Sequence, residues 1–396
     1  MTVFRISSLG ATLSLLLPLL SACASQPGAA QTVHTAPAAK PVIIVDDAPL
    51  PPPVPDGEPA NLLERTDVQQ FMDGLVGTHG FQRAELEAFF SSVRLNDNAI
   101  QLMRPAPPGQ PRNWQTYRAR FVEPTRINAG LNFWNAHEAT LKKAEATYGV
   151  PPEIIVGIIG VETLYGRYTG RYRVPDVLTT LAFAYPDTPN RIPRMEYFRR
   201  EVANVLLLAR ERGIDPFTLT GSYAGAIGLP QFMPGSIRAF AVDFDGDSKI
   251  DLLNSPADAI GSVANFLVRH GWQSGQPFAF PASVSDNPEE WGHLLKQGLA
   301  AKNTLEDVRR TGVRPQEGTP PEFRYGLVDL QNGTEPTEYW LGTPNFFAIT
   351  HYNRSYFYAM AVIDLGLAVK QAKQPSTPAT SPPASSPASR PAASGN

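Results

Sequence analysis

The chain has 396 residues, of which 42% are hydrophobic and 18% are charged, so it can bury a sizeable core spread over two or three domains. Its formal net charge of −3 produces no field that would attract nucleic acid, and we expect no nucleic-acid partner. The 39 prolines are concentrated toward the two ends, so we expect any chemistry to lie in the middle of the chain.

The N-terminus has the pattern of a bacterial lipoprotein signal peptide. A short apolar run over residues 13–20, too short to span a bilayer, ends in Leu20-Ser21-Ala22-Cys23, which resembles a lipobox. We therefore expect residues 1–22 to be removed and Cys23, the sole cysteine, to carry a lipid anchor. Because Ala24 is not aspartate, resemblance to enterobacterial lipoproteins favours the outer membrane, with the protein facing the periplasm. The alternative is an ordinary signal peptide beside a coincidental cysteine.

Both ends of the mature chain have compositions that are typical of segments without a packed core. Residues 23–57 are rich in proline and alanine, which predicts a linker that begins at the lipidated Cys23. Residues 374–396 consist almost wholly of Pro, Ala, Ser and Thr, which predicts a disordered tail.

Four regions are predicted between these ends. Helical periodicity predicts a helical domain over residues 58–150 and a helical core over 151–274. Short strand-like pieces predict a small β domain over 275–348. The helical pattern resumes over 349–373, where we expect the chain to return to the core.

Two of these patterns predict individual elements. Residues 128–148 have apolar positions at helical spacing, which predicts a helix over that range. Residues 323–330 and 338–341 are strand-like and flank the turn Gln331-Asn332-Gly333, which predicts a β-hairpin.

Glu162 stands at the end of an unusually apolar helical pattern. The pattern begins at Pro151-Pro152 and is apolar over residues 154–161, which predicts a buried helix. A carboxylate next to so much hydrocarbon is desolvated, so its protonated form is favoured and it can donate a proton near neutral pH. The alternative is a structural glutamate that pairs with Arg167 or caps a loop. Its position alone leaves both interpretations open.

The surrounding motifs resemble the membrane-bound lytic murein transglycosylase B family. They follow one another in the family's order over roughly residues 60–370, which makes the resemblance specific. The motifs are Gly160-Val161-Glu162-Thr163, Gly166-Arg167, Asp176 with Leu181-Ala182-Phe183, Tyr185-Pro186, Gly221-Ser222-Tyr223-Ala224-Gly225-Ala226-Ile227-Gly228, Gln231-Phe232-Met233-Pro234, His351-Tyr352-Asn353-Arg354-Ser355 and Tyr358.

The resemblance implies a mainly α (α+β) fold, with a lysozyme-like helical core, a helical N-terminal domain and a small inserted β domain. It implies an enzyme that cleaves the β-1,4 bond between N-acetylmuramic acid and N-acetylglucosamine of peptidoglycan and forms a 1,6-anhydromuramoyl end. Glu162 would be its only acid and base, because the sugar's own C6 hydroxyl replaces water. The alternatives are a hydrolytic muramidase and a non-catalytic peptidoglycan-binding lipoprotein.

The resemblance also implies partners and substrate contacts. The partners are glycan strands, the membrane through the lipid anchor, and cell-wall synthases as candidates. Aromatic rings with polar neighbours suit the apolar faces and hydroxyls of sugars, although each tyrosine taken alone is better explained by core packing. Arg194 would meet a carboxylate of the peptide stem, and Phe266 stands where the family often has tyrosine. The expected contacts are Tyr117, Arg194, Ser222, Gln231, Phe232, Tyr352, Asn353 and Tyr358.

The segment Asp243 to Asn254 resembles an EF-hand loop, with oxygen donors at loop positions one, three and five. Ser248 replaces the usual glycine and Asn254 the usual glutamate, so weaker binding is expected. Because similar loops in the resembled family bind calcium, we expect a structural Ca²⁺ or Na⁺ and no cofactor for catalysis. The alternative is a solvated acidic turn that caps the next helix. The predicted ligands are Asp243, Asp245, Asp247, the carbonyl of Lys249, and Asp258.

Overall fold

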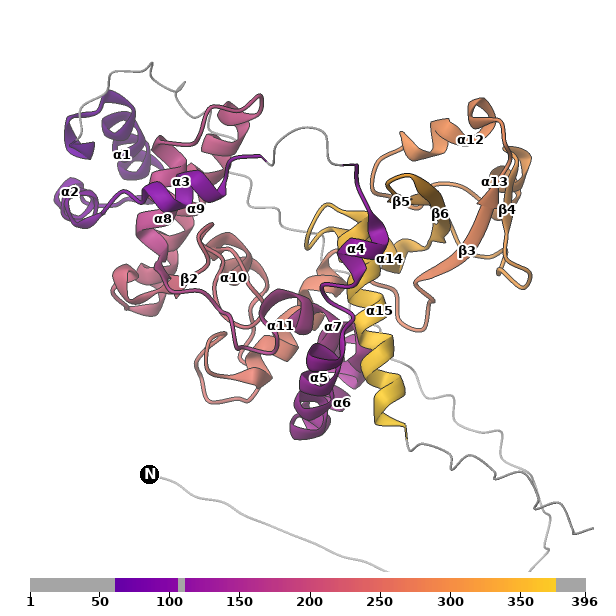
Figure 1. Ribbon diagram of the computed structural model, residues 1–396. Helices are drawn as coiled ribbons and strands as arrows, with labels where there is room; N and C mark the ends of the chain where they lie inside the picture. The colour runs from indigo at the N-terminus through magenta and orange to yellow at the C-terminus, as the bar shows by residue number, and fades with distance from the viewer. Residues whose placement is uncertain (1–60, 106–110, 375–396) are drawn as a thin grey trace, which may run out of the picture. The chain divides into compact units, whose positions relative to one another are not determined.

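The computed structural model describes residues 61–105 and 111–374 (Figure 1). Cys23, the signal peptide, the linker and the tail after residue 374 lie outside the described residues, and what the sequence suggests of them stays a prediction. Among the helices that are described, none combines the length and the apolar character needed to cross a bilayer.

One group of helices combines the start of the described chain with two later helices. Helix α3 packs against α8, and α8 packs along α9. The group comprises η1 (Leu62–Glu64), α1 (Thr66–His79), α2 (Arg83–Ser92), α3 (Asp97–Leu102), α8 (Val174–Phe183) and α9 (Arg191–Arg212), with η2 (Pro216–Thr218) beside α8 and α9.

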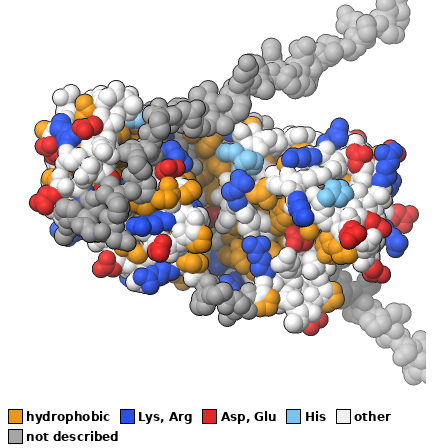
Figure 2. All heavy atoms as spheres, turned by 90° about the horizontal axis from the view of Figure 1, so that it is seen from above, with side chains coloured by type: hydrophobic (Ala, Val, Ile, Leu, Met, Phe, Trp, Pro, Cys, Tyr) orange, Lys and Arg blue, Asp and Glu red, His pale blue; other side chains and the backbone are white. Residues whose placement is uncertain are grey.

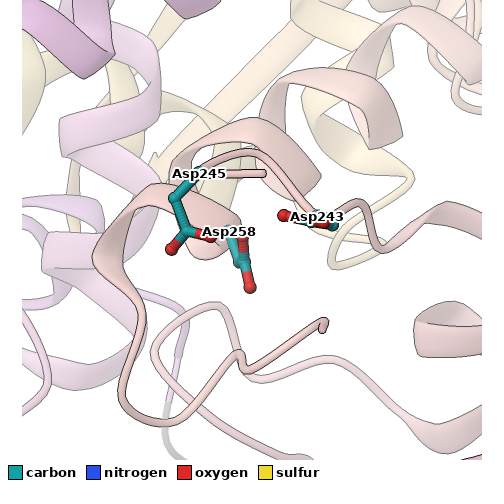
Figure 3. Close-up of side chains that lie close together, drawn as sticks. All are labelled: Asp243, Asp245 and Asp258. Atoms are coloured by element: carbon teal, nitrogen blue, oxygen red, sulfur yellow. The ribbon is translucent and has the colours of Figure 1, made fainter. Parts of the chain in front are cut away.

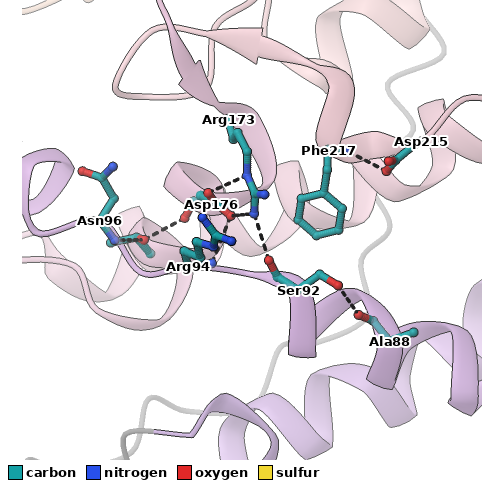
Figure 4. A network of polar contacts seen from close by, with 9 residues as sticks. Ala88, Ser92, Arg94, Asn96, Arg173, Asp176, Asp215 and Phe217 are labelled. Carbon is teal, nitrogen blue, oxygen red and sulfur yellow. Dashed lines mark hydrogen bonds and ion pairs between the residues drawn. The ribbon is translucent and has the colours of Figure 1, made fainter.

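The ion pair Arg173–Asp176 at the start of α8 is hydrogen-bonded to the end of α2 and to the segment after it (Figure 4). Arg173 donates from Nε and Nη2 to the two carboxylate oxygens of Asp176, both at 2.8 Å, and from Nη2 to the Ser92 carbonyl at 2.8 Å. Asp176 Oδ1 also accepts the backbone N–H of Arg94 at 3.0 Å. The guanidinium lies 4.7 Å from the ring centre of Phe217. The motif residue Asp176 is therefore a structural link between the early helices and α8.

A second group of helices surrounds α7 (Figure 1). Helix α7 packs along α15 and also against α5, α6 and α11. The group comprises α4 (Trp114–Arg118), α5 (Pro124–Ala136), α6 (Glu138–Tyr148), α7 (Pro152–Thr163), α11 (Pro256–Arg269) and α15 (Tyr356–Lys373). Helices on both sides of residue 150 thus share one packed core.

Two glycines allow α7 and α15 to lie very close together. A Cβ atom at Gly157 would lie 2.2 Å from the carbonyl oxygen of Val362, and one at Gly366 would lie 2.0 Å from the carbonyl oxygen of Glu153. Both distances are far shorter than a van der Waals contact, so only glycine fits at these positions.

Residues 128–136 and 138–148 are helical as predicted, but the prediction of a single helix over 128–148 is wrong, because they are divided between α5 and α6. His137 lies between them with φ −119° and ψ 24°, outside the helical region. Its ring packs against Phe133, with centroids 4.7 Å apart. A continuous apolar pattern does not reveal a break at one residue, because the period of the pattern barely changes there.

The small β region is a four-stranded antiparallel sheet in the order β4-β3-β6-β5. The predicted hairpin is present, and Asn332 pairs with Glu335 around a turn in which Gly333 has φ 68°. Helices α12 and α13 pack with the sheet around a separate apolar cluster. The elements are β3 (Ala279–Val284), α12 (Pro288–Leu295), α13 (Leu305–Arg310), β4 (Val313–Pro315), β5 (Gly326–Asn332) and β6 (Glu335–Gly342).

The remaining elements lie next to the candidate site. A two-stranded sheet pairs β1 with β2, α10 packs against α9, and α14 leads from β6 to α15. Their bounds are β1 (Tyr172–Arg173), β2 (Thr220–Gly221), α10 (Pro234–Phe240) and α14 (Pro344–Thr350).

Candidate active site

Glu162 lies in the last turn of α7, as the sequence predicts. The helix ends sharply because Leu164 and Tyr165 adopt left-handed conformations, with φ of 50° and 58°. Thr163 anchors this end: its hydroxyl donates to the Leu229 carbonyl at 2.9 Å and accepts the N–H of Gly166 at 3.0 Å. Backbone strain of this kind persists only where surrounding contacts hold it, so the position of Glu162 is well defined.

Among the described residues, the Glu162 carboxyl has one hydrogen-bond partner, Tyr358. The tyrosine hydroxyl donates to Oε1 at 2.5 Å. Burial raises the pKa of Glu162 to about 7, and the hydrogen bond from Tyr358 opposes that rise. No ion pair involves Glu162 within residues 61–105 and 111–374, so the structural alternative of pairing with Arg167 is not observed. A carboxyl with this pKa can donate and accept a proton near neutral pH.

Three of the predicted tyrosines surround Glu162. Tyr352 stacks on Tyr358, with ring centroids 6.2 Å apart and planes at 15°, and its hydroxyl donates to the Pro230 carbonyl at 2.6 Å. Burial, followed by the charge of Glu162, raises the pKa values of Tyr117, Tyr352 and Tyr358. All three hydroxyls therefore stay protonated at neutral pH, and those of Tyr352 and Tyr358 already donate to Pro230 and Glu162. Tyr358 is 2% exposed, so the expectation that it contacts the glycan directly is wrong, and it acts on Glu162 instead.

Phe232 was expected to form a wall of the glycan groove, and the structure corrects that expectation. The residue is 2% exposed and packs against Tyr352 and Phe266, with centroids 5.7 Å and 5.5 Å away. Phe266, in turn, lies edge-on to Tyr352 at 4.8 Å. A buried ring offers no face to a sugar, so Phe232 and Phe266 support Tyr352 from beneath.

Gln231 and Ser222 lie in tight loops, and their side chains already form hydrogen bonds with backbone groups of the protein. Gln231 has φ 52°, and its Nε2 donates to the carbonyls of Gly228 at 2.9 Å and Thr169 at 3.1 Å. Only its side-chain oxygen remains for a ligand. Ser222 Oγ accepts the N–H of Ala226 at 3.1 Å, so its own hydroxyl hydrogen remains available.

The two remaining predicted substrate contacts, Asn353 and Arg194, differ in exposure. Asn353 is exposed in the loop between α14 and α15. Arg194 is enclosed by aromatic rings: its guanidinium carbon lies 5.8 Å, 5.5 Å and 5.2 Å from the ring centres of Tyr185, Tyr197 and Phe198, and its Nε donates to the Tyr185 hydroxyl at 3.3 Å. These rings hold the Arg194 side chain in one place.

The acidic loop brings three carboxylates together (Figure 3). One oxygen each from Asp243, Asp245 and Asp258 lie within 4.8 Å of one another, and this set of hard oxygen donors fits Ca²⁺ or Na⁺. Asp247, the predicted donor at loop position five, is not in the group, and its Oδ1 instead accepts the backbone N–H of Lys249 at 2.8 Å.

Asp258 also organises the protein around the acidic loop. Its two carboxylate oxygens accept the N–H groups of Phe244 at 2.7 Å and Asp251 at 2.8 Å. The side chain is buried at the start of α11. A cation here would therefore connect the loop directly to α11.

Comparison with known proteins identifies the family. The family model described as the transglycosylase SLT domain matches residues 64–367. The chain belongs to this family. The membrane-bound lytic murein transglycosylase B of Escherichia coli (strain K12) is 43% identical over 315 residues, which are 78% of this chain and 83% of the relative. The family expected from the motifs is thereby confirmed.

Solved structures agree with the fold of this transglycosylase. Soluble lytic transglycosylase SltB1 from Pseudomonas aeruginosa is 43% identical, with a TM-score of 0.68 over 77% of this chain and 98% of that chain. The Escherichia coli lytic transglycosylase Slt35 in complex with calcium is 42% identical, with a TM-score of 0.66 over 77% and 93%. The predicted lysozyme-like, mainly helical fold with small antiparallel sheets is confirmed.

Proposed function

This protein is a peptidoglycan lytic transglycosylase, and we propose that Glu162 is its only catalytic acid and base. The main support is the hydrogen bond between Glu162 and Tyr358 in a setting that raises the pKa of the carboxyl to about 7. An acid with a pKa near the working pH is efficient both at giving and at taking a proton.

The reaction needs two proton transfers through the same carboxyl. Glu162 first donates its proton to the glycosidic oxygen between N-acetylmuramic acid and N-acetylglucosamine, while the bond from that oxygen to C1 breaks. The resulting carboxylate then takes the proton of the C6 hydroxyl of the muramic acid, and the C6 oxygen bonds to C1. The product is a 1,6-anhydro ring, the carboxyl is protonated again, and no water is consumed.

The neighbours of Glu162 favour this reaction over hydrolysis. Inverting and retaining hydrolases pair the acid with a second carboxylate. The described groups that interact with Glu162 are tyrosines: Tyr358 by hydrogen bond, and Tyr117 and Tyr352 through its charge. Tyr117 and Tyr352 are partly exposed and can position the sugar, and a C6 hydroxyl held next to C1 replaces water at a lower entropic cost.

The test is the mass of the products released from murein sacculi. We expect muramoyl ends that are lighter by one water than hydrolysed ends, and no product from Glu162→Gln. Glu145→Gln, which changes an exposed carboxylate on α6, is the matched control and should digest like the parent. Reducing muramic acid ends would instead identify a hydrolase, and unchanged digestion by Glu162→Gln would remove the catalytic assignment.

We also propose that Asp243, Asp245 and Asp258 hold a structural Ca²⁺, or Na⁺ in its place. The convergence of the three carboxylates supports this, as does the calcium complex of the related Slt35. Bound to the folded state alone, the ion would raise the thermal midpoint, and above its Kd the rise would grow with the logarithm of its concentration. We expect that rise with calcium, and its loss in Asp245→Ala. An unchanged midpoint in calcium would contradict the proposal.

The proposed location is the outer membrane, with a lipid anchor on Cys23 and the protein facing the periplasm. The lipobox pattern supports this, and the Escherichia coli relative is described as membrane-bound. Cell-wall synthases are candidate partners. We expect Cys23→Ala to move the protein from the membrane fraction to the soluble fraction of the periplasm. Continued sedimentation of this variant with the outer membrane would argue against the anchor.

A further inference from the structure

A pocket next to the catalytic carboxyl carries two arginines that the mechanism above does not use. It has a volume of about 520 Å³, within the range of small-ligand pockets. The residues that matter for its chemistry are Arg112, Thr116, Tyr117, Arg120, Ser355 and Phe357.

Two contacts connect this pocket to Glu162. Tyr117 lines the pocket, packs against Phe357 with centroids 5.6 Å apart, and has its pKa raised by burial and by the charge of Glu162. On the other wall, the Oγ of Ser355 accepts the backbone N–H of Tyr358, which donates to Glu162. Tyr117 and Ser355 therefore link the lining of the pocket to the surroundings of Glu162.

Arg112 and Arg120 give the pocket a positive charge, and within the described residues their guanidinium groups are free to bind a ligand. Arg112 and Arg120 are exposed, and in the described part of the chain neither guanidinium forms an ion pair or a side-chain hydrogen bond. Arg118, which lies between them in sequence, is instead paired with Asp364 at 2.5 Å. The acid whose charge interacts with Arg112 is Asp329, and that carboxyl is half-buried and hydrogen-bonded to Gln331. Neither pocket arginine is therefore neutralised by a direct partner.

The surface around the middle of the molecule has the same character. Figure 2 shows a hollow with apolar side chains in its depth and with several lysine or arginine side chains, among acidic ones, near its rim. An apolar floor with a cationic rim suits a ligand that combines carbon-rich and anionic parts.

We propose that this pocket binds a carboxylate of the peptide stem of peptidoglycan through the guanidinium groups of Arg120 and Arg112. The inference rests on the proposed function, since the stem is attached to the muramic acid whose bond Glu162 cleaves. A peptide stem carries free carboxylates, and arginine binds a carboxylate through two parallel hydrogen bonds. The rings of Tyr117 and Phe357 offer apolar surface for the alkyl parts of the stem.

This assignment differs from the one that the sequence motifs suggest. Arg194 is the candidate from the motifs, yet its guanidinium is surrounded by the rings of Tyr185, Tyr197 and Phe198. Arg112 and Arg120 have no such enclosure. The pair in the pocket is therefore the better donor set for a stem carboxylate.

The experiment compares two substrates prepared from the same murein: glycan strands that keep their peptide stems, and strands whose stems an amidase has removed. For Arg120→Gln and Arg112→Gln in the full chain, we expect kcat/KM on stem-bearing strands to fall about tenfold. On stripped strands it should stay within about twofold of the parent. Arg309→Gln, which removes an exposed arginine on α13, is the matched control and should alter neither.

Equal losses on both substrates, or no loss on stem-bearing strands, would overturn the proposal. Binding gives a second readout that needs no turnover. In the Glu162→Gln protein, calorimetry should show tighter binding of a muramoyl disaccharide with its pentapeptide than of the disaccharide alone, and Arg120→Gln should abolish that difference. The binding comparison does not depend on which product forms. Reducing ends from the parent enzyme would therefore refute the proposed reaction, whereas the binding data alone would decide the role of the two arginines.

Discussion

The hydroxyl of Tyr358 donates a 2.5 Å hydrogen bond to Oε1 of Glu162, across 196 residues of sequence. Burial and this bond act on the carboxyl in opposite directions: burial favours its protonated form, and the donated hydrogen bond favours its charged form. The resulting pKa of about 7 is therefore a balance that the α7–α15 contact maintains.

Removing the hydroxyl should shift that balance. In Tyr358→Phe the charged carboxylate loses its donor, so we expect the pKa of Glu162 to rise above 7 and activity to persist to higher pH than in the parent. The measurement is kcat/KM against pH. Tyr168→Phe, at a tyrosine that is 71% exposed, is the control. A profile that stays in place, or moves to lower pH, would contradict the role given to Tyr358.

The raised pKa of Glu162 should also appear in protein stability. The folded state holds the proton up to a pH of about 7, against a reference pKa of 4.5, so the unfolded chain releases it first as pH rises. Stability from this group is therefore fully present below pH 4.5 and is lost between about pH 4.5 and 7, by roughly 3 kcal/mol. Glu201, whose burial also raises its pKa to about 7, adds to the same trend.

Glu162→Gln tests this directly, because it keeps an acceptor for Tyr358 and carries no charge. We expect it to be more stable than the parent at pH 8 by roughly 2 to 3 kcal/mol, with the difference disappearing at pH 4.5. Urea unfolding at the two pH values measures it. Glu145→Gln, at an exposed site, should show no such pH-dependent gain. If Glu162→Gln and the parent had the same free energy of unfolding at pH 8, ionised Glu162 would not destabilise the folded state, and the prediction would be wrong.

Thr163 belongs to the motif Gly160-Val161-Glu162-Thr163, and the structure shows that it positions the turn after Glu162. Its hydroxyl holds Leu229 and Gly166 around the left-handed turn after Glu162. Thr163→Val keeps the shape and loses both hydrogen bonds, so we expect a loss of about 1 to 3 kcal/mol in the free energy of unfolding. We also expect kcat to fall with KM little changed. Thr163→Ser should restore kcat, and a kcat for Thr163→Val equal to that of the parent would contradict this role.

The close contact of α7 and α15 makes Gly157 sensitive to substitution. In Gly157→Ala the new methyl would lie 2.2 Å from the Val362 carbonyl oxygen, so the helices must separate, at a cost of about 1 to 3 kcal/mol or more. Gly74→Ala on α1, where nothing lies within 4 Å, is the matched control, and its better helix propensity should stabilise by up to about 1 kcal/mol. Thermal unfolding distinguishes the two, and equal midpoints would refute the close packing.

Much of the site could be predicted from short stretches of sequence. The apolar run before Glu162 predicts both the buried helix and the desolvated acid, because burial of a whole helix is encoded in its own residues. The turn at Gln331-Asn332-Gly333 likewise predicts the β5–β6 hairpin, whose register depends on local turn chemistry.

Other features depend on residues that meet only when the chain folds. Local periodicity could not reveal that His137 interrupts a helix, since the apolar pattern continues through it. It could not show that Phe232 lies beneath Tyr352, because an aromatic residue has the same sequence pattern in a groove and in a core.

The family, the helix that ends at Glu162 and the acidic loop could thus be predicted from the amino-acid sequence, since each is expressed in neighbouring residues. The folded structure was needed to see which group binds Glu162, which three carboxylates converge, and that Arg112 and Arg120 share a pocket with Tyr117. Glu162 and Tyr358 are 196 positions apart, and the pocket around Arg112, Tyr117 and Arg120 is completed by the distant residues Ser355 and Phe357, so the packing of nonlocal elements creates both.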